Sequence, residues 1–207
     1  MKTLQHPTTT TFQHSRLLTA SIIFMVLSMA FSKLNAQTTF QAIPVASTIK
    51  VLGSSNLHDW TMIDERPTAS AVFSYQDGKI SDLSSLTFSM LVKELKSKED
   101  LLNTRAYKAM EADKYANISF KLTSATISPL PNNHFQIKAY GKLQISGVTK
   151  DVVLVANAIQ NADKSVSCGG TEKLKMSDYG ISPPSFMFGA LKVVDEVSIN
   201  FNLKFKN

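Results

Sequence analysis

The chain has 207 residues, of which 22 are basic and 16 acidic, and it contains four histidines, one tryptophan and a single cysteine, Cys168. No run of basic residues interleaved with aromatics occurs, so no nucleic acid partner is expected. One cysteine allows no intramolecular disulfide, so packing must stabilise the fold.

The first 36 residues are predicted to form a signal peptide. A basic start precedes the apolar run LLTASIIFMVLSMAF at 17–31, and Ala36 offers a small residue at the cut. The run is short for a membrane span, which favours a secretory leader over an uncleaved anchor. We therefore expect a periplasmic or secreted protein with one domain over 37–207. Cleavage removes three basic residues and no acid, so the formal charge of +6 falls to +3.

After residue 37 the dominant pattern is an alternation of apolar and polar residues, which is the period of a β-strand. The alternation occupies 86–92, 118–122, 135–145 and 197–205. Turn-forming residues occupy 75–79, 129–133, 146–151 and 168–170. Strands with short connections predict an antiparallel sandwich or barrel. Periodicity alone favours an ordinary filled core, whereas the many Phe and Met side chains favour an adaptable apolar pocket, so both interiors stay open.

One segment breaks the alternation. Residues 99–114, EDLLNTRAYKAMEADK, are rich in helix formers, lack Gly and Pro, and place Leu102, Ala106 and Met110 four apart. We predict a helix, or a helix followed by a turn, that lies across the β structure. Arg105 is expected on the solvated face of this helix, in local ion pairs with neighbouring carboxylates.

The stretch SSNLHDWT at 54–61 contains the only tryptophan. On a strand, His58 and Trp60 face one side and Asp59 faces the other, so His58 and Asp59 make a poor catalytic dyad. The residues alone favour a hydrogen-bonded histidine and a packing tryptophan over a ligand contact.

No catalytic or metal site is predicted. His134 lies in a polar turn, and two separated histidines with one cysteine fall short of a zinc ligand set. Cys168, which has no histidine near it in the sequence, is expected to be an unreactive surface or loop residue. Asp64 is expected in solvent near a turn. We therefore expect a protein that is not an enzyme and that needs no cofactor.

Three motifs, in order along the chain, resemble those of the YceI-like family. They are YxxIxF at 115–120, GxLxIxGVTK at 141–150, and DYGI at 178–181 followed by a closing VxDxVxI strand. The similarity spans roughly 40–207. The resemblance implies an all-β fold with one short helix: an extended, antiparallel, lipocalin-like barrel of about eight strands, whose interior holds a long isoprenoid chain.

The resemblance also implies where a ligand would lie. The residues predicted to line an apolar tunnel are Ile49, Val51, His58, Trp60, Phe88, Met90, Phe120, Leu122, Leu143, Ile145, Phe186, Phe188, Ile199 and Phe201. The last part of this set includes two aromatics of the apolar stretch PPSFMFGALKV at 183–193. We interpret that stretch as a loop that forms a partner patch or a lip touching the membrane.

The function that the resemblance implies is to sequester or carry a long-chain apolar ligand, a polyisoprenoid or a quinone-like lipid, without catalysis. The alternative is an envelope protein-interaction module with a filled barrel and no ligand. Transient contact with a membrane or an envelope protein is expected, and the protein is expected to be a monomer or a homodimer.

Overall fold

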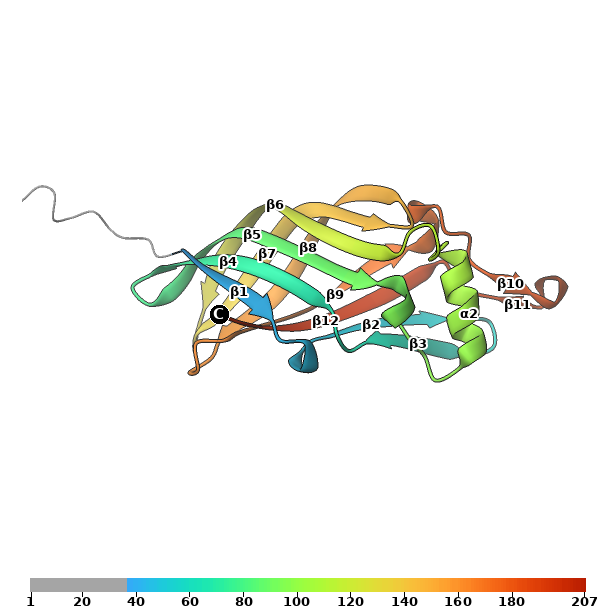
Figure 1. Ribbon diagram of the computed structural model, residues 1–207, viewed down its shortest axis with the longest axis horizontal. Coiled ribbons are helices and arrows are strands. Elements are labelled where there is room, and N and C mark those ends of the chain that lie inside the picture. Colours follow the sequence, from blue (N-terminus) through green and yellow to red (C-terminus); the bar gives the residue numbers. More distant parts are fainter. Residues whose placement is uncertain (1–36) are drawn as a thin grey trace, which may run out of the picture. The chain divides into compact units, whose positions relative to one another are not determined.

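The computed structural model describes residues 37–207, so the predicted signal peptide lies outside the described residues (Figure 1). The strands are β1 (Gln37–Ala42), β2 (Thr48–Ser54), β3 (Asp59–Asp64), β4 (Thr68–Gln76), β5 (Lys79–Leu91), β6 (Asn117–Leu130), β7 (His134–Ile145), β8 (Val148–Gln160), β9 (Val166–Lys175), β10 (Ser185–Phe186), β11 (Leu191–Lys192) and β12 (Glu196–Lys206). The helices are α2 (Asp100–Ala109) and the short 3-10 helices η2 (Pro44–Ala46), η3 (Val92–Glu94), η4 (Met176–Tyr179) and η5 (Met187–Gly189).

Eight strands close an antiparallel barrel in the order β1-β4-β5-β6-β7-β8-β9-β12. The last strand meets the first, because Gln41 and Ala42 of β1 pair with Lys206 and Phe205 of β12. The predicted fold class, an antiparallel barrel of about eight strands with one short helix, is confirmed.

Strands β2 and β3 are additional to the closed barrel, and they extend the sheet from β12. Residues 48–52 of β2 pair with 198–202 of β12, and β3 pairs with β2. Ile63 of β3 then exchanges two backbone hydrogen bonds with Lys96, with N···O distances of 2.7 and 2.9 Å. The barrel wall beside β12 is therefore made of different segments along its length. Over one part it consists of β1 and β4. Over another part it consists of β2, β3 and the segment at Lys96.

Aromatic side chains fill the barrel near the β1–β12 closure. Phe73 and Phe205 are almost completely buried, and Phe40 meets Phe73 edge to face with ring centroids 5.4 Å apart. Phe73 and Phe205 make a second edge-to-face contact at 6.2 Å. Such pairs add to the stabilisation that burial provides, so this end is a packed core.

Helix α2 lies at the other end of the barrel, where the β2–β3 loop and the β10–β11 hairpin also lie (Figure 1). Tyr107 anchors the helix, because its hydroxyl lies 3.0 Å from the carbonyl oxygens of both Lys93 and Leu95. The side chain of Asn103 accepts a hydrogen bond from the backbone N–H of Ser97 at 2.7 Å. Turns follow the helix at 110–114, so the prediction of a helix followed by a turn is confirmed.

Asn56 joins the two loops at this end. Its amide donates to the carbonyl of Ala190 at 2.7 Å, and its side-chain oxygen accepts from the backbone N–H of Lys192 at 2.9 Å. The β2–β3 loop and the β10–β11 hairpin are thus held side by side. The segment at 183–193, predicted to be a loop, contains this short hairpin.

Two residues expected at the surface are buried. The segment 168–170 was expected to turn, but it lies within β9, and the strand alternation places Cys168 in the core with 7% of its surface exposed. Asp64, at the end of β3, is 2% exposed, and its carboxylate accepts from the backbone N–H of Arg66 at 2.7 Å. Burial raises the pKa of Asp64, and the Arg66 hydrogen bond opposes that rise. Both predictions were wrong because local turn chemistry and charge say nothing of packing across the barrel.

Backbone pairing between β8 and β9 is confined to one end of these strands. All of β7 pairs with β8, but β8 pairs with β9 only over 157–160 against 166–169. Gly170, just past the paired region, has no room for a side chain. A Cβ there would overlap the carbonyl oxygen of Val155 on β8 and lie 2.5 Å from the ring of Phe201. The absence of a side chain at Gly170 therefore allows β8 and β9 to lie this close just past the paired region.

Candidate binding tunnel

The barrel contains an inner and an outer cavity, both lined mainly by apolar side chains. The inner cavity, next to the packed aromatic end, has a volume of about 130 Å³. The outer cavity, beneath α2 and beside the β10–β11 hairpin, has a volume of about 170 Å³. An engineered protein cavity of about 150 Å³ binds benzene. Each cavity therefore has room for an apolar group of about that size.

Four side chains line both cavities: Val51, Ile118, Ile145 and Ile199. We call these four residues the neck. Val51 and Ile199 lie on the paired strands β2 and β12, whereas Ile118 and Ile145 lie on β6 and β7, which are separated from β12 by β8 and β9 in the sheet. Because the cavities share the neck, they adjoin, and we call the two cavities together the tunnel.

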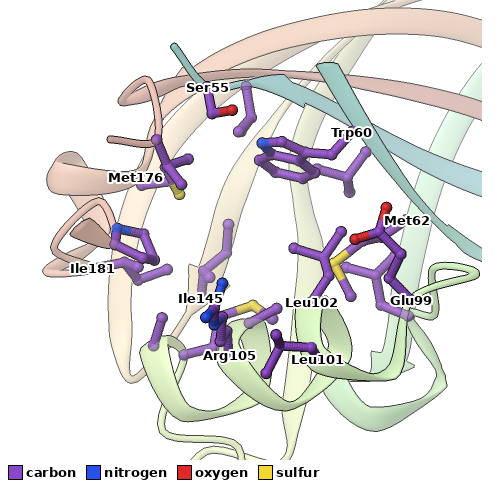
Figure 2. A pocket seen from close by; sticks show the side chains of 18 of the residues that line it. Ser55, Trp60, Met62, Glu99, Leu101, Leu102, Arg105, Ile145, Met176 and Ile181 are labelled. Carbon is purple, nitrogen blue, oxygen red and sulfur yellow. The ribbon is translucent and has the colours of Figure 1, made fainter. Parts of the chain in front are cut away.

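Helix α2 forms one wall of the outer cavity. Leu102, Ala106 and Met110, which the sequence places four apart, all line it. Residues at this spacing share one face of a helix. Figure 2 shows Leu101, Leu102 and Arg105 of the helix facing Trp60 across the cavity. The apolar stripe of α2 therefore covers a cavity rather than a filled core.

Trp60 lies on the strand side of the mouth, where β3 pairs with β2. Its register partner is Gly53, and a Cβ on Gly53 would overlap the indole ring, so the ring covers the glycine. The indole Nε1–H is buried and has no hydrogen-bond partner among the described residues. A buried donor without an acceptor is energetically costly, so this N–H is a feature of the site that packing alone does not explain.

His58 and Arg105 add polar groups to the mouth. The Nδ1 of His58 lies 2.8 Å from the backbone oxygen of Asp59, so in this contact Nδ1 donates and Nε2 is left free. The guanidinium carbon of Arg105 lies 3.7 Å from the centroid of the Phe186 ring. Arg105 was expected in local ion pairs on a solvated face, and this is corrected: it lines the outer cavity, because β10 brings Phe186 against it.

Two titratable side chains line the inner cavity, both on β9. Burial raises the pKa of the Cys168 thiol to about 12, so the thiol is protonated at neutral pH. Glu172 is the one charged residue of this cavity, and burial raises the pKa of its carboxyl. His58 lines only the outer cavity and Cys168 only the inner one, so these two residues do not form a nucleophile–base pair.

The structure brings most of the predicted tunnel residues together. Those lining at least one cavity are Ile49, Val51, His58, Trp60, Phe88, Met90, Phe120, Leu143, Ile145, Phe186, Ile199 and Phe201. Leu122 packs against the core without lining either cavity. Phe188 does not line the tunnel either, because it lies at the exposed tip of the β10–β11 hairpin. Ligand contact by these residues stays a prediction.

Sequence reasoning missed Arg105 and Glu172. The sequence does contain a signal for Glu172, since Cys168, Gly170, Glu172 and Leu174 occupy alternate positions of β9 and share one face. The other side chains of this face are small or apolar and point inward, so the pattern predicts that the Glu172 carboxylate lies inside the barrel. No comparable signal exists for Arg105, whose partner Phe186 is 81 residues away in the sequence.

The fold and the tunnel define a closed antiparallel β-barrel with an apolar interior. The YceI-like domain matches residues 9–205, nearly the whole sequence, and the chain belongs to the YceI-like family. No curated protein matches the chain. Within the described residues, no helix is long and apolar enough to cross a membrane. The same residues contain no group of three or more His, Cys, Asp or Glu side chains that could hold a metal ion.

Solved structures share the fold at low sequence identity. BcnA from Burkholderia cenocepacia is 18% identical, with a TM-score of 0.64, and the match covers 79% of this chain and 98% of BcnA. A polyisoprenoid binding domain from Saccharophagus degradans is 13% identical, with a TM-score of 0.61 and coverage of 81% and 97%. The YceI protein of Campylobacter jejuni is 18% identical, with a TM-score of 0.51 and coverage of 67% and 81%.

Proposed function

We propose that this protein binds one long-chain apolar ligand, a polyisoprenoid or a quinone-like lipid, in the tunnel and carries or stores it unchanged. The observation that carries the proposal is the neck, because the same four apolar side chains line both cavities, and small movements of these side chains would join the cavities into one apolar path. Burial of each CH₂ group contributes about 0.8 kcal/mol, so an apolar chain in this path needs little further recognition. The fold shared with the polyisoprenoid binding domain supports this ligand class.

The size of the tunnel limits how much of a ligand it encloses. A cavity of about 150 Å³ holds the six carbons of benzene, so the two cavities together enclose on the order of a dozen carbons. A longer chain must leave through the mouth or widen the tunnel. The outer cavity is lined by Met62, Met110 and Met176, whose unbranched side chains adapt readily to varied shapes.

We further propose that the protein is periplasmic or secreted, on the strength of its leader-like start, and that it collects its ligand at a membrane. Four exposed apolar side chains lie on the elements at the helix end of the barrel: Leu57 in the β2–β3 loop, Leu101 on α2, Phe188 at the tip of the β10–β11 hairpin and Val194 just after β11. We call these four residues the rim. Phe188 has a φ of 55°, which bulky residues rarely adopt, and its side chain is fully exposed. An apolar rim suits transient contact with a lipid surface, from which a ligand passes without entering water.

The proposal is tested by titrating the purified protein with prenols of increasing length and following the fluorescence of Trp60, the only tryptophan, which lines the mouth. Ile199→Phe fills the neck, and Asn202→Phe places the same ring on the outer face of the same strand as a matched control. We expect saturable binding of one 15- to 20-carbon prenol per chain in the wild-type protein. Ile199→Phe should lower the affinity for the prenol about tenfold or more, and Asn202→Phe should not. Absence of binding, or an equal effect of both variants, contradicts the proposal.

A further inference from the structure

We propose that the tunnel mouth is a head-group site, in which Arg105 and Trp60 bind a negatively charged, oxygen-rich end of the ligand, such as a phosphate or a carboxylate. This inference rests on the proposed function and adds to it. It concerns the polar end of the ligand, whereas the apolar chain is held by the tunnel.

Arg105 supplies an unused cation. It lines the outer cavity and is half-buried, and none of its guanidinium N–H groups donates to a described residue or lies in an ion pair with one. The guanidinium lies over the Phe186 ring, so its face is covered while its donors, which lie in its plane, stay free. An arginine held in this way is oriented to bind an oxyanion through two parallel hydrogen bonds.

Trp60 supplies an unused donor on the facing wall. Its Nε1–H has no acceptor among the described residues, and its ring is fixed over Gly53. Figure 2 shows the indole and the Arg105 side chain on opposite sides of the same space. A ligand oxygen placed between them, with a small shift of the indole or its cover, would satisfy the orphan donor and pair the arginine.

The other charged residue that lines the outer cavity is Glu99. It forms no ion pair with Arg105, and Figure 2 places it beside Met62, whereas Arg105 lies beside Ile145. Because Glu99 repels an anion, the head group is expected on the Arg105 side of the mouth, beside Ile145 and Ile181. The mouth therefore has a cationic side and an anionic side, which fixes how an asymmetric head group would sit.

The test compares two ligands with the same chain, farnesyl monophosphate and farnesol, by isothermal titration calorimetry. We expect the wild-type protein to bind the phosphate about tenfold or more tightly than the alcohol. Arg105→Gln should reduce this preference, measured as the ratio of the two affinities in the same variant, to within about twofold. Lys108→Gln removes an exposed cation from the same helix and should leave the preference intact. Trp60→Phe keeps a ring over Gly53 but removes the indole N–H. This variant should bind farnesyl monophosphate more weakly than the wild-type protein does.

The outcomes separate the two proposals. Equal affinity for phosphate and alcohol in the wild-type protein, or an unchanged preference in Arg105→Gln, overturns the head-group site and leaves the carrier function standing. Failure of the wild-type protein to bind either ligand overturns the carrier function itself. A parallel comparison of dodecanoate with dodecanol shows which oxyanions the site accepts. A site for any oxyanion binds dodecanoate more tightly than dodecanol, whereas a site that requires phosphate binds the two equally.

Discussion

The indole ring of Trp60 occupies the space that a side chain at Gly53 would need, so the two residues, partners across β2 and β3, fit only as a pair. Gly53→Ala is expected to displace the ring and to lower the free energy of unfolding by about 1–3 kcal/mol, the usual cost of overpacking. Chemical denaturation measures this loss. In a Trp60→Ala background the same change at Gly53 should cost much less, because the clash is gone. An equal cost in both backgrounds would show that the ring does not depend on the glycine.

Gly169 and Gly170 are neighbours in β9, but we expect a side chain to be tolerated at Gly169 and not at Gly170. A Cβ on Gly170 would overlap the carbonyl oxygen of Val155, whereas the nearest atom to a Cβ on Gly169 is the backbone oxygen of Phe201 at an ordinary 3.6 Å. Gly170→Ala can be accommodated only by moving β8 away from β9, so we expect it to cost about 1–3 kcal/mol more than Gly169→Ala. Urea unfolding of the two variants side by side tests this, and equal stabilities would contradict the close approach of the strands.

Cys168 should be unreactive in the folded protein. With its pKa raised from 9.0 to about 12, the thiolate fraction at pH 8 falls on the order of a thousandfold. We expect a thiol reagent such as 5,5′-dithiobis(2-nitrobenzoic acid) to label the protein only after unfolding. Rapid labelling of the native protein would mean that the inner cavity opens to solvent at β9.

The same thiol should make stability depend on alkaline pH. Between pH 9 and pH 12 the unfolded chain releases the thiol proton and the folded chain keeps it. The stabilisation is therefore complete below pH 9 and is lost as the pH rises, at about 1 kcal/mol per pH unit. Cys168→Ala should show a shallower decline than the wild type over this window. Parallel declines would indicate that tyrosines and lysines alone set the alkaline limit.

The rim predicts where the protein touches a membrane. Phe188→Ser should slow transfer of a bound prenol to neutral phosphatidylcholine vesicles several-fold, because it removes an exposed ring that can enter the lipid surface. It should leave the free energy of unfolding within about 0.5 kcal/mol, because the side chain makes no buried contact. Leu130→Ser is the matched control, since Leu130 is an exposed leucine at the end of β6 remote from the mouth. Equal transfer rates in both variants would remove the rim from the mechanism.

The alternation of apolar residues was enough to predict the strands and the inward faces of β5, β6, β7 and β12. The helix followed from composition and spacing alone. The closure of the barrel was harder to predict from the sequence, because β12 pairs with both β1 and β2 along one edge. These pairings join residues more than 140 positions apart. Sequence reasoning placed Cys168 and Arg105 outside for the same reason: their burial is decided by distant strands, Cys168 by β12 and Arg105 by β10.

The tunnel itself could be predicted only through family resemblance. Periodicity identifies which side chains point inward, as it did for Ile145 and Ile199, but it does not say whether they meet or leave a gap. That difference depends on the volumes of the individual side chains that face each other across the barrel. The polar groups of the mouth arise where a helix, a loop and a hairpin come together, so no single stretch of sequence encodes them.

Native mass spectrometry of the protein, purified without detergent from the envelope of its own cells, would show whether the barrel carries a lipid. We expect one long-chain apolar lipid per chain, which organic extraction releases and which is lost in Ile199→Phe but kept in Asn202→Phe. A ligand-free mass that does not change after incubation with prenols would overturn the proposed carrier function and favour a protein that acts through its outer surface.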